Sequence, residues 1–108
     1  MLEQAVPPDL PAGLSIRLAT LGRAMWSAEV TGVGRQKWPR YFTQPATATY
    51  TRVRIQAAVA RRAPDHPGTN TAVVHLVWAG ADPSGTYLDG RPATVRLTRE
   101  GATWNPVR

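Results

Sequence analysis

The sequence predicts an α+β domain in which one N-terminal helix packs on a strongly curved antiparallel sheet of about four strands. Two observations lead to this prediction. Between residues 13 and 30, apolar residues recur at the spacing of one helical face. From residue 49 onward, apolar and polar residues alternate in short runs separated by turn-forming residues, which is typical of a meander of antiparallel strands.

Length and composition favour one globular unit. A chain of 108 residues has the size of a single domain, and its 43% hydrophobic and 19% charged content is that of a folded protein. Residues 1–12 are rich in proline and predict an extended arm or linker, so the predicted domain covers residues 13–108. The absence of cysteine excludes disulfides, thiolate metal ligands and a cysteine nucleophile.

The charge balance is basic, with 13 Lys and Arg against 7 Asp and Glu and a formal net charge of +6. Such a surface attracts polyanions, so nucleic acid is one candidate partner. The chain lacks an apolar run of membrane-spanning length and a secretion signal, so a membrane would be reached only through an anchor outside this sequence. We expect an extracytoplasmic or cell-surface location for a trimmed domain, and a cytoplasmic one if Met1 is the natural start.

The helix is predicted from Gly13 to about Val30. Its apolar stripe consists of Leu14, Leu18, Leu21, Met25, Trp26 and Val30. Ser15 is the expected N-cap, and the Thr31-Gly32 pair is the expected stop. Gly22 inside the helix costs about 1 kcal/mol relative to alanine, which suggests that another part of the backbone approaches closely there.

Residues 32–46 predict a loop, because they contain two glycines and two prolines without a clear period. Its three large rings, Trp38, Tyr41 and Phe42, are expected to fold back onto the sheet. Cations interleave with these rings, as on surfaces that bind single-stranded nucleic acid or anionic lipid. The candidate binding residues are Arg35, Lys37, Trp38, Arg40, Tyr41, Arg52 and Arg54, with Arg61 and Arg62 extending one basic face.

Residues 49–60 predict the first strand, with one face toward the core and one face exposed to solvent. The inward residues are Val53, Ile55, Ala57 and Val59, and the outward residues are Arg52, Arg54 and Gln56. Residues 72–79 predict a second strand that is apolar on both faces and therefore central.

Several turn signals organise the remaining chain. Residues 80–85 predict a bulge or wide turn, and Asp89-Gly90 predicts a tight hairpin turn. Residues 93–99 alternate again, and Glu100-Gly101 turns the chain into a last strand over residues 102–107. Trp104 is expected to pack at the end of the sheet.

The acid–base candidates give no catalytic set. They are Tyr41, Asp65, His66, His75, Asp82 and Asp89, most of them in turn sequences. Two histidines without cysteine or a suitably spaced carboxylate do not make a zinc site, and no glycine-rich phosphate loop is present. We therefore predict no catalytic residues, no metal and no cofactor, and keep His75, Trp78 and Asp82 as candidates for lining a cavity.

Residues 47–107, which include the run Thr94-Val-Arg-Leu-Thr-Arg-Glu-Gly-Ala-Thr-Trp104, resemble the nuclear transport factor two-like superfamily. Within it, the pattern is most similar to noncatalytic domains of conjugation and secretion channel subunits. Enzymatic members have three N-terminal helices, whereas this chain has room for one. The resemblance implies a noncatalytic assembly module that contacts other protein subunits, including copies of itself. A nucleic-acid-binding module and a small-molecule-binding or isomerase-like domain remain the alternatives.

Overall fold

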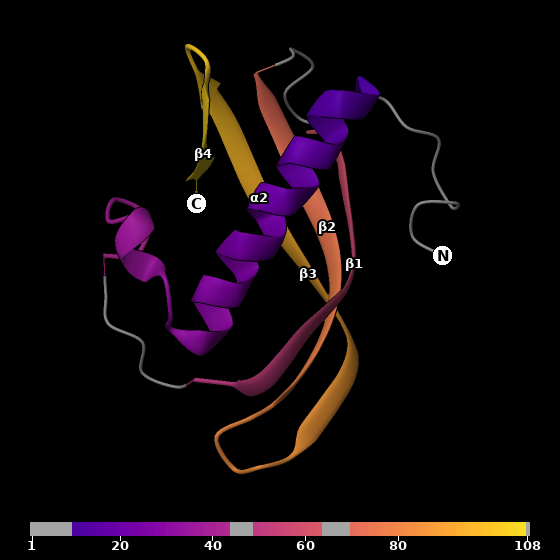
Figure 1. Ribbon diagram of the computed structural model, residues 1–108, viewed down its shortest axis with the longest axis vertical. Coiled ribbons are helices and arrows are strands. Elements are labelled where there is room, and N and C mark those ends of the chain that lie inside the picture. Colours follow the sequence, from indigo (N-terminus) through magenta and orange to yellow (C-terminus); the bar gives the residue numbers. More distant parts are fainter. Residues whose placement is uncertain (1–9, 44–48, 64–69, 108) are drawn as a thin grey trace.

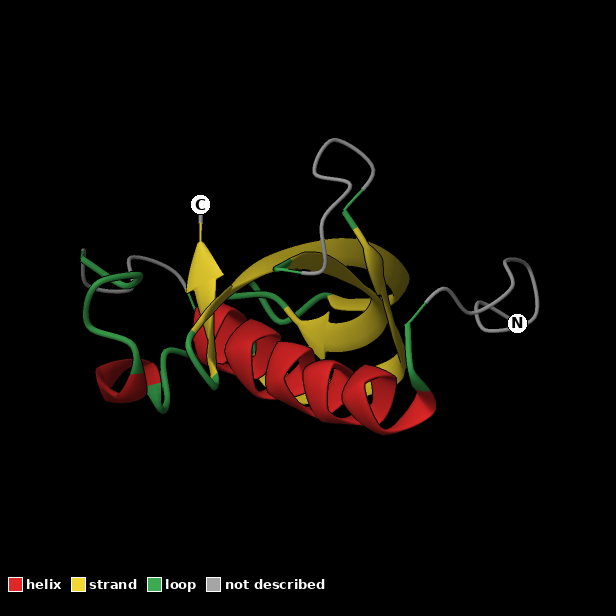
Figure 2. Ribbon diagram, turned by 90° about the horizontal axis from the view of Figure 1, so that it is seen from above, coloured by secondary structure: helices red, strands yellow, loops and turns green. Residues whose placement is uncertain are grey.

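The computed structural model describes residues 10–43, 49–63 and 70–107. The helix α2 (Ala12–Thr31) is followed by a short 3-10 helix, η1 (Arg35–Lys37), and four strands. These strands are β1 (Thr51–Arg62), β2 (Thr71–Ala81), β3 (Tyr87–Glu100) and β4 (Thr103–Val107). They form one antiparallel sheet in the order β1-β2-β3-β4, which curls around one side of α2 without closing (Figures 1 and 2). The predicted α+β class is confirmed.

Helix α2 begins earlier than the capping pattern indicates. Pro11 occupies the N-cap position, and the amide of Ser15 donates to the Pro11 carbonyl at 2.8 Å. The prediction of Ser15 as N-cap is wrong, because the helix already begins at Ala12 and the Ser15 amide makes a helical i→i−4 hydrogen bond to Pro11. The predicted stop is confirmed: Gly32 has φ 80°, and its amide donates to the Ala28 carbonyl at 3.0 Å.

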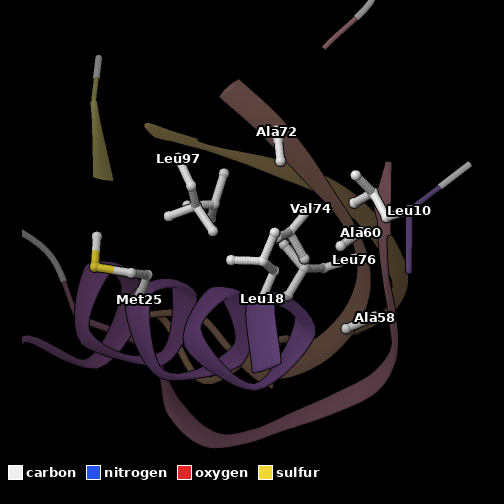
Figure 3. Close-up of a cluster of buried hydrophobic side chains, with 10 residues drawn as sticks. Leu10, Leu18, Met25, Ala58, Ala60, Ala72, Val74, Leu76 and Leu97 are labelled. Atoms are coloured by element: carbon white, nitrogen blue, oxygen red, sulfur yellow. The ribbon is translucent and has the colours of Figure 1, made fainter. Parts of the chain in front are cut away.

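The core lies between α2 and the concave face of the sheet (Figure 3). Leu18 and Met25 project from the helix, and Val74, Leu76 and Leu97 meet them from the two central strands. The predicted helical stripe is therefore confirmed. Leu10 also joins this core, so the part of the predicted arm next to the helix is packed, while residues 1–9 lie outside the described chain.

Strand β1 changes face at a bulge. Ile55 packs against the core as predicted, but the register with β2 shifts between Ile55 and Ala57. Beyond this point Ala58 and Ala60 enter the core, and Ala57 and Val59 lie on the opposite face. The prediction that Ala57 and Val59 point inward is wrong, because a bulge inserts one residue and inverts the alternation after it.

The Asp89-Gly90 pair is a bulge and not the predicted hairpin turn. Strand β3 pairs with β2 on both sides of it, as Gly80 with Leu88 and Trp78 with Arg91. The chain reverses instead in the wide turn over residues 82–86, which overlaps the segment 80–85 predicted as a bulge or wide turn. Glycine suits both a bulge and a tight turn, because each can place a residue at positive φ.

The bulges of β1 and β3 lie at the same level of β2, and Gln56 joins them. Its side-chain amide donates to Asp89 Oδ1 at 2.6 Å, and its Oε1 accepts from the Gly90 amide at 3.3 Å. Strands β1 and β3 are not neighbours in the sheet, so this contact crosses β2. Gln56 thus fixes the bend of the sheet where it curls.

We expect Gln56→Glu to destabilise the protein more than Gln56→Ala. Replacement by alanine removes the hydrogen bonds of Gln56 and should lower the free energy of unfolding by about 1 kcal/mol. Replacement by glutamate also places a second carboxylate beside Asp89. Urea unfolding at neutral pH measures both losses. The difference between the two variants should shrink at acidic pH, where the carboxyl groups are neutral. Equal stability of the two variants at neutral pH would contradict the role given to Gln56.

Candidate functional site

A groove of about 510 Å³ lies between the loop after α2 and the C-terminal strand. Residues 37–41 form one wall, and Glu100 with residues 105–107 forms the other. Both views place η1 and β4 on the same side of the molecule (Figures 1 and 2). The groove therefore brings together two segments that are far apart in the sequence.

The loop wall is held by its own backbone and by ring contacts. Tyr41 and Phe42 both donate their amides to the Trp38 carbonyl, at 3.1 and 3.0 Å. Phe42 contacts the Tyr41 ring edge to face at 4.8 Å between centroids, and the Trp38 ring at 6.4 Å. All three rings pack against the core, as predicted. This wall is pre-formed, which lowers the entropic cost of binding a ligand.

Arg35 belongs to the scaffold of this wall. Its guanidinium donates to the carbonyls of Ala28 (3.1 Å) and Glu29 (2.7 Å) at the C-terminal end of α2, and pairs with the Glu29 carboxylate at 3.3 Å. It also lies 4.7 Å from the centroid of the Phe42 ring. A cation is favoured at a helix C-terminus, so Arg35 fastens the loop to the helix. It does not line the groove.

The predicted basic face is divided in the structure. Lys37 and Arg40 line the groove together with the predicted rings Trp38 and Tyr41. Arg52 lies instead at the start of β1, where its guanidinium is 5.4 Å from the centroid of the Tyr87 ring.

The other predicted arginines are also away from the groove. Arg54 pairs with Ala79 at the same end of the sheet as Arg52. Arg61 is 8% exposed, and its Nη1 donates to the Ala60 carbonyl at 2.9 Å, so the expectation of a solvated side chain there is wrong. A single continuous cationic surface is not assembled from the predicted arginines.

His75, Trp78 and Asp82 do not come together. Trp78 faces the helix, where its ring meets Trp26 at 5.7 Å and Tyr50 at 5.1 Å between centroids. His75 is three residues away on a regular strand and therefore lies on the opposite face, in a second hollow of about 370 Å³. Asp82 is in the turn after β2. The strand alternation separates the predicted cavity residues.

The Asp82 carboxylate organises the turn between β2 and β3. Its Oδ1 accepts from the Ser84 hydroxyl at 2.6 Å and from the amides of Ser84 and Thr86 at 3.0 and 2.9 Å. The hydrogen bond from the Ser84 side chain, helped by the backbone amides, lowers the pKa of Asp82 from its ordinary value of 3.8. The hydrogen bonds within the turn therefore account for the lowered pKa of Asp82.

We expect the charged form of Asp82 to stabilise the fold at neutral pH. Because its folded pKa is lower than 3.8, this stabilisation is complete above the unfolded pKa and is lost as pH falls through the folded one. In Asp82→Asn the acid-induced loss below about pH 4 should become smaller than in the wild type. Thermal melts across this range test it, and identical pH profiles would contradict it.

The wall formed by the end of β3 and by β4 was not predicted as part of a site. Glu100, Asn105, Pro106 and Val107 line the groove, yet none carried a functional prediction. One signal was present: a proline in a strand belongs on an edge, and Pro106 marks β4 as the edge of the sheet. An edge strand beside a ring-bearing loop is a reason to look for a groove.

Comparison with known proteins identifies no relative: no protein-family model, curated protein or solved structure matches this chain. The resemblance to nuclear transport factor two-like domains thus stays a prediction. In the described part of the chain, no group of three or more acidic or histidine side chains could hold a metal ion. No helix among these residues combines the length and apolar character needed to cross a membrane.

Proposed function

We propose that this chain is a noncatalytic assembly module whose groove binds a peptide segment of another protein subunit. The observation that carries the proposal is the groove itself, which joins the pre-formed aromatic loop to an edge strand. Tyr41 and Trp38 offer apolar ring surface, and β4, the edge strand of the sheet in the described chain, offers the backbone groups of its outer side beside them. Ring surface and strand edge are together the features by which proteins capture extended peptides.

The distribution of the other candidate residues favours this function over its alternatives. Phosphate backbones need clustered cations. Lys37 and Arg40 line the groove, whereas Arg35 lies at the helix end, Arg52 at the start of β1 and Arg61 opposite Val73. An isomerase-like site needs its acid and base near one substrate, whereas His75 and Asp82 lie on a sheet face and in a turn.

The resemblance to conjugation and secretion channel subunits supports the same class of function. A part in such an apparatus, and self-association, belong to this proposal as its biological setting. The face of β2 away from the helix carries Val73, His75 and Val77, of which Val73 is 8% exposed and the other two are half-buried. Self-association through this face stays a prediction that sedimentation at high concentration would test.

A peptide selection with residue-level mapping tests the proposed function. Peptides of about twelve random residues are selected on the immobilised protein, and the binders are titrated into isotope-labelled protein. We expect amide shifts to concentrate at residues 37–41 and 104–107. Binders that map to the second hollow beside His75, or a selection that enriches none, would overturn the proposal.

A further inference from the structure

The free edge of β4 has a defined set of backbone groups. In an antiparallel pair, hydrogen-bonded and non-hydrogen-bonded residue pairs alternate. Pro106 is opposite Leu97 and has no N–H, so this pair cannot exchange both hydrogen bonds and is of the non-bonded kind. The same follows for Arg99 and Trp104, two residues away. The N–H and C=O of Trp104 and the C=O of Pro106 therefore point away from β3.

The turn before β4 agrees with this assignment. Only Gly101 and Ala102 separate the paired residues Glu100 and Thr103. Gly101 has φ 63°, the positive φ that a type II′ turn requires at its first central residue. A two-residue hairpin turn is closed by a hydrogen-bonded pair, which makes Thr103 and Asn105 bond to β3 and Trp104 face outward. Two independent features thus give the same hydrogen-bonding pattern.

The groove beside this edge carries excess positive charge. Lys37 and Arg40 are exposed in it, and Glu100 is the single carboxylate among its lining residues. Among the described residues, neither cation forms an ion pair, and the salt bridge present there joins Arg35 to Glu29. The consecutive residues 105, 106 and 107 all line the groove, which indicates that it follows the strand edge and not one face of the sheet.

We propose that the groove binds an acidic, extended segment of a partner protein, which pairs with β4 as a fifth strand and sets carboxylates against Lys37 and Arg40. This inference rests on the proposed function and names its partner class. The segment supplies the N–H donors that the carbonyls of Trp104 and Pro106 require, and one carbonyl for the Trp104 N–H. A second copy of β4 fits less well, because it would bring the same missing donor at Pro106.

Two designed peptides of about eight residues test the inference, one alternating Glu with Val and the other Lys with Val. We expect the Glu peptide to bind about tenfold tighter, with a preference that falls as salt rises. N-methylation of one alternate set of its amides should abolish binding, whereas methylation of the other set should not, because only one set faces β4.

Charge-reversal variants locate the peptide. In Lys37→Glu/Arg40→Glu the Glu peptide should lose at least about tenfold in affinity. The control Arg17→Glu/Arg91→Glu changes the net charge equally at two exposed positions away from the groove and should bind as the wild type does. Circular dichroism checks that all variants are folded.

Several outcomes overturn the acidic-strand inference: equal binding of both peptides, equal effects of both methylation patterns, or no binding of the Glu peptide. Tighter binding of an oligothymidine that displaces it would assign the groove to nucleic acid instead. If selected random peptides still map to the groove, the assembly function survives and only the partner class is wrong. If nothing maps there, both proposals fail.

Discussion

Gly22→Ala should destabilise the protein, although alanine is the better helix former. A Cβ at position 22 would lie 2.5 Å from Val74 Cγ1, 2.7 Å from its Cβ and 2.9 Å from its Cγ2. Val74 is fully buried on the central strand β2 and is stiff at its branched Cβ. Overpacking costs about 1–3 kcal/mol, and at these distances we expect it to exceed the helix gain of about 1 kcal/mol.

The same helix offers a matched control. A Cβ at Gly13 meets nothing within 4 Å, so Gly13→Ala should leave stability unchanged or raise it by up to about 1 kcal/mol. Urea unfolding followed by circular dichroism measures both variants. If Gly22→Ala is as stable as Gly13→Ala, the close approach of α2 to β2 is wrong.

A double-mutant cycle makes the test specific to the contact. Val74→Ala removes two of the three atoms that the new Cβ would meet. The combined variant Gly22→Ala/Val74→Ala should therefore lose less stability than the sum of the single losses. Simple additivity would place the cost of Gly22→Ala elsewhere than at Val74.

Trp78→Ala should cause the largest loss of stability among the substitutions considered, about 3–5 kcal/mol. Trp78 is 4% exposed and joins Trp26 of α2 to Tyr50 at the entrance of β1 through two edge-to-face contacts. A domain of this size is stable by about 5–15 kcal/mol, so this loss is a large fraction of the total. The ring contacts where the helix, β1 and β2 meet would be lost together.

Two comparisons separate the packing role of Trp78 from general loss of aromatic surface. Trp78→Phe keeps a ring on the core face and should lose less stability than the alanine variant. Tyr87→Ala removes an exposed ring that is stacked on Arg52, and should cost less than about 1 kcal/mol. A loss at Trp78 no larger than that at Tyr87 would contradict its place in the core.

Local patterns in the sequence determined the elements of this fold. The stripe from Leu14 to Val30 specified α2 because residues at helical spacing share a face, and Gly32 specified its end because glycine accepts the left-handed conformation. Alternation specified the strands, and the Glu100-Gly101 turn returned the last one to the sheet. The rings of Trp38 and Tyr41 were also recognised as part of a candidate site.

Only the tertiary structure decided which face each residue occupies and which segments form the groove. The bulge after Ile55 exchanged the inward and outward faces of β1. The Asp89-Gly90 pair forms a bulge although its sequence is typical of a turn, because long-range pairing with β2 outweighs the local turn preference. Arg35 binds the end of the helix, since the fold places its guanidinium beside the carbonyls of the last helical turn, a contact that the sequence does not reveal. The groove arises because β4 folds back beside residues 37–41, a contact between distant segments that no local pattern encodes.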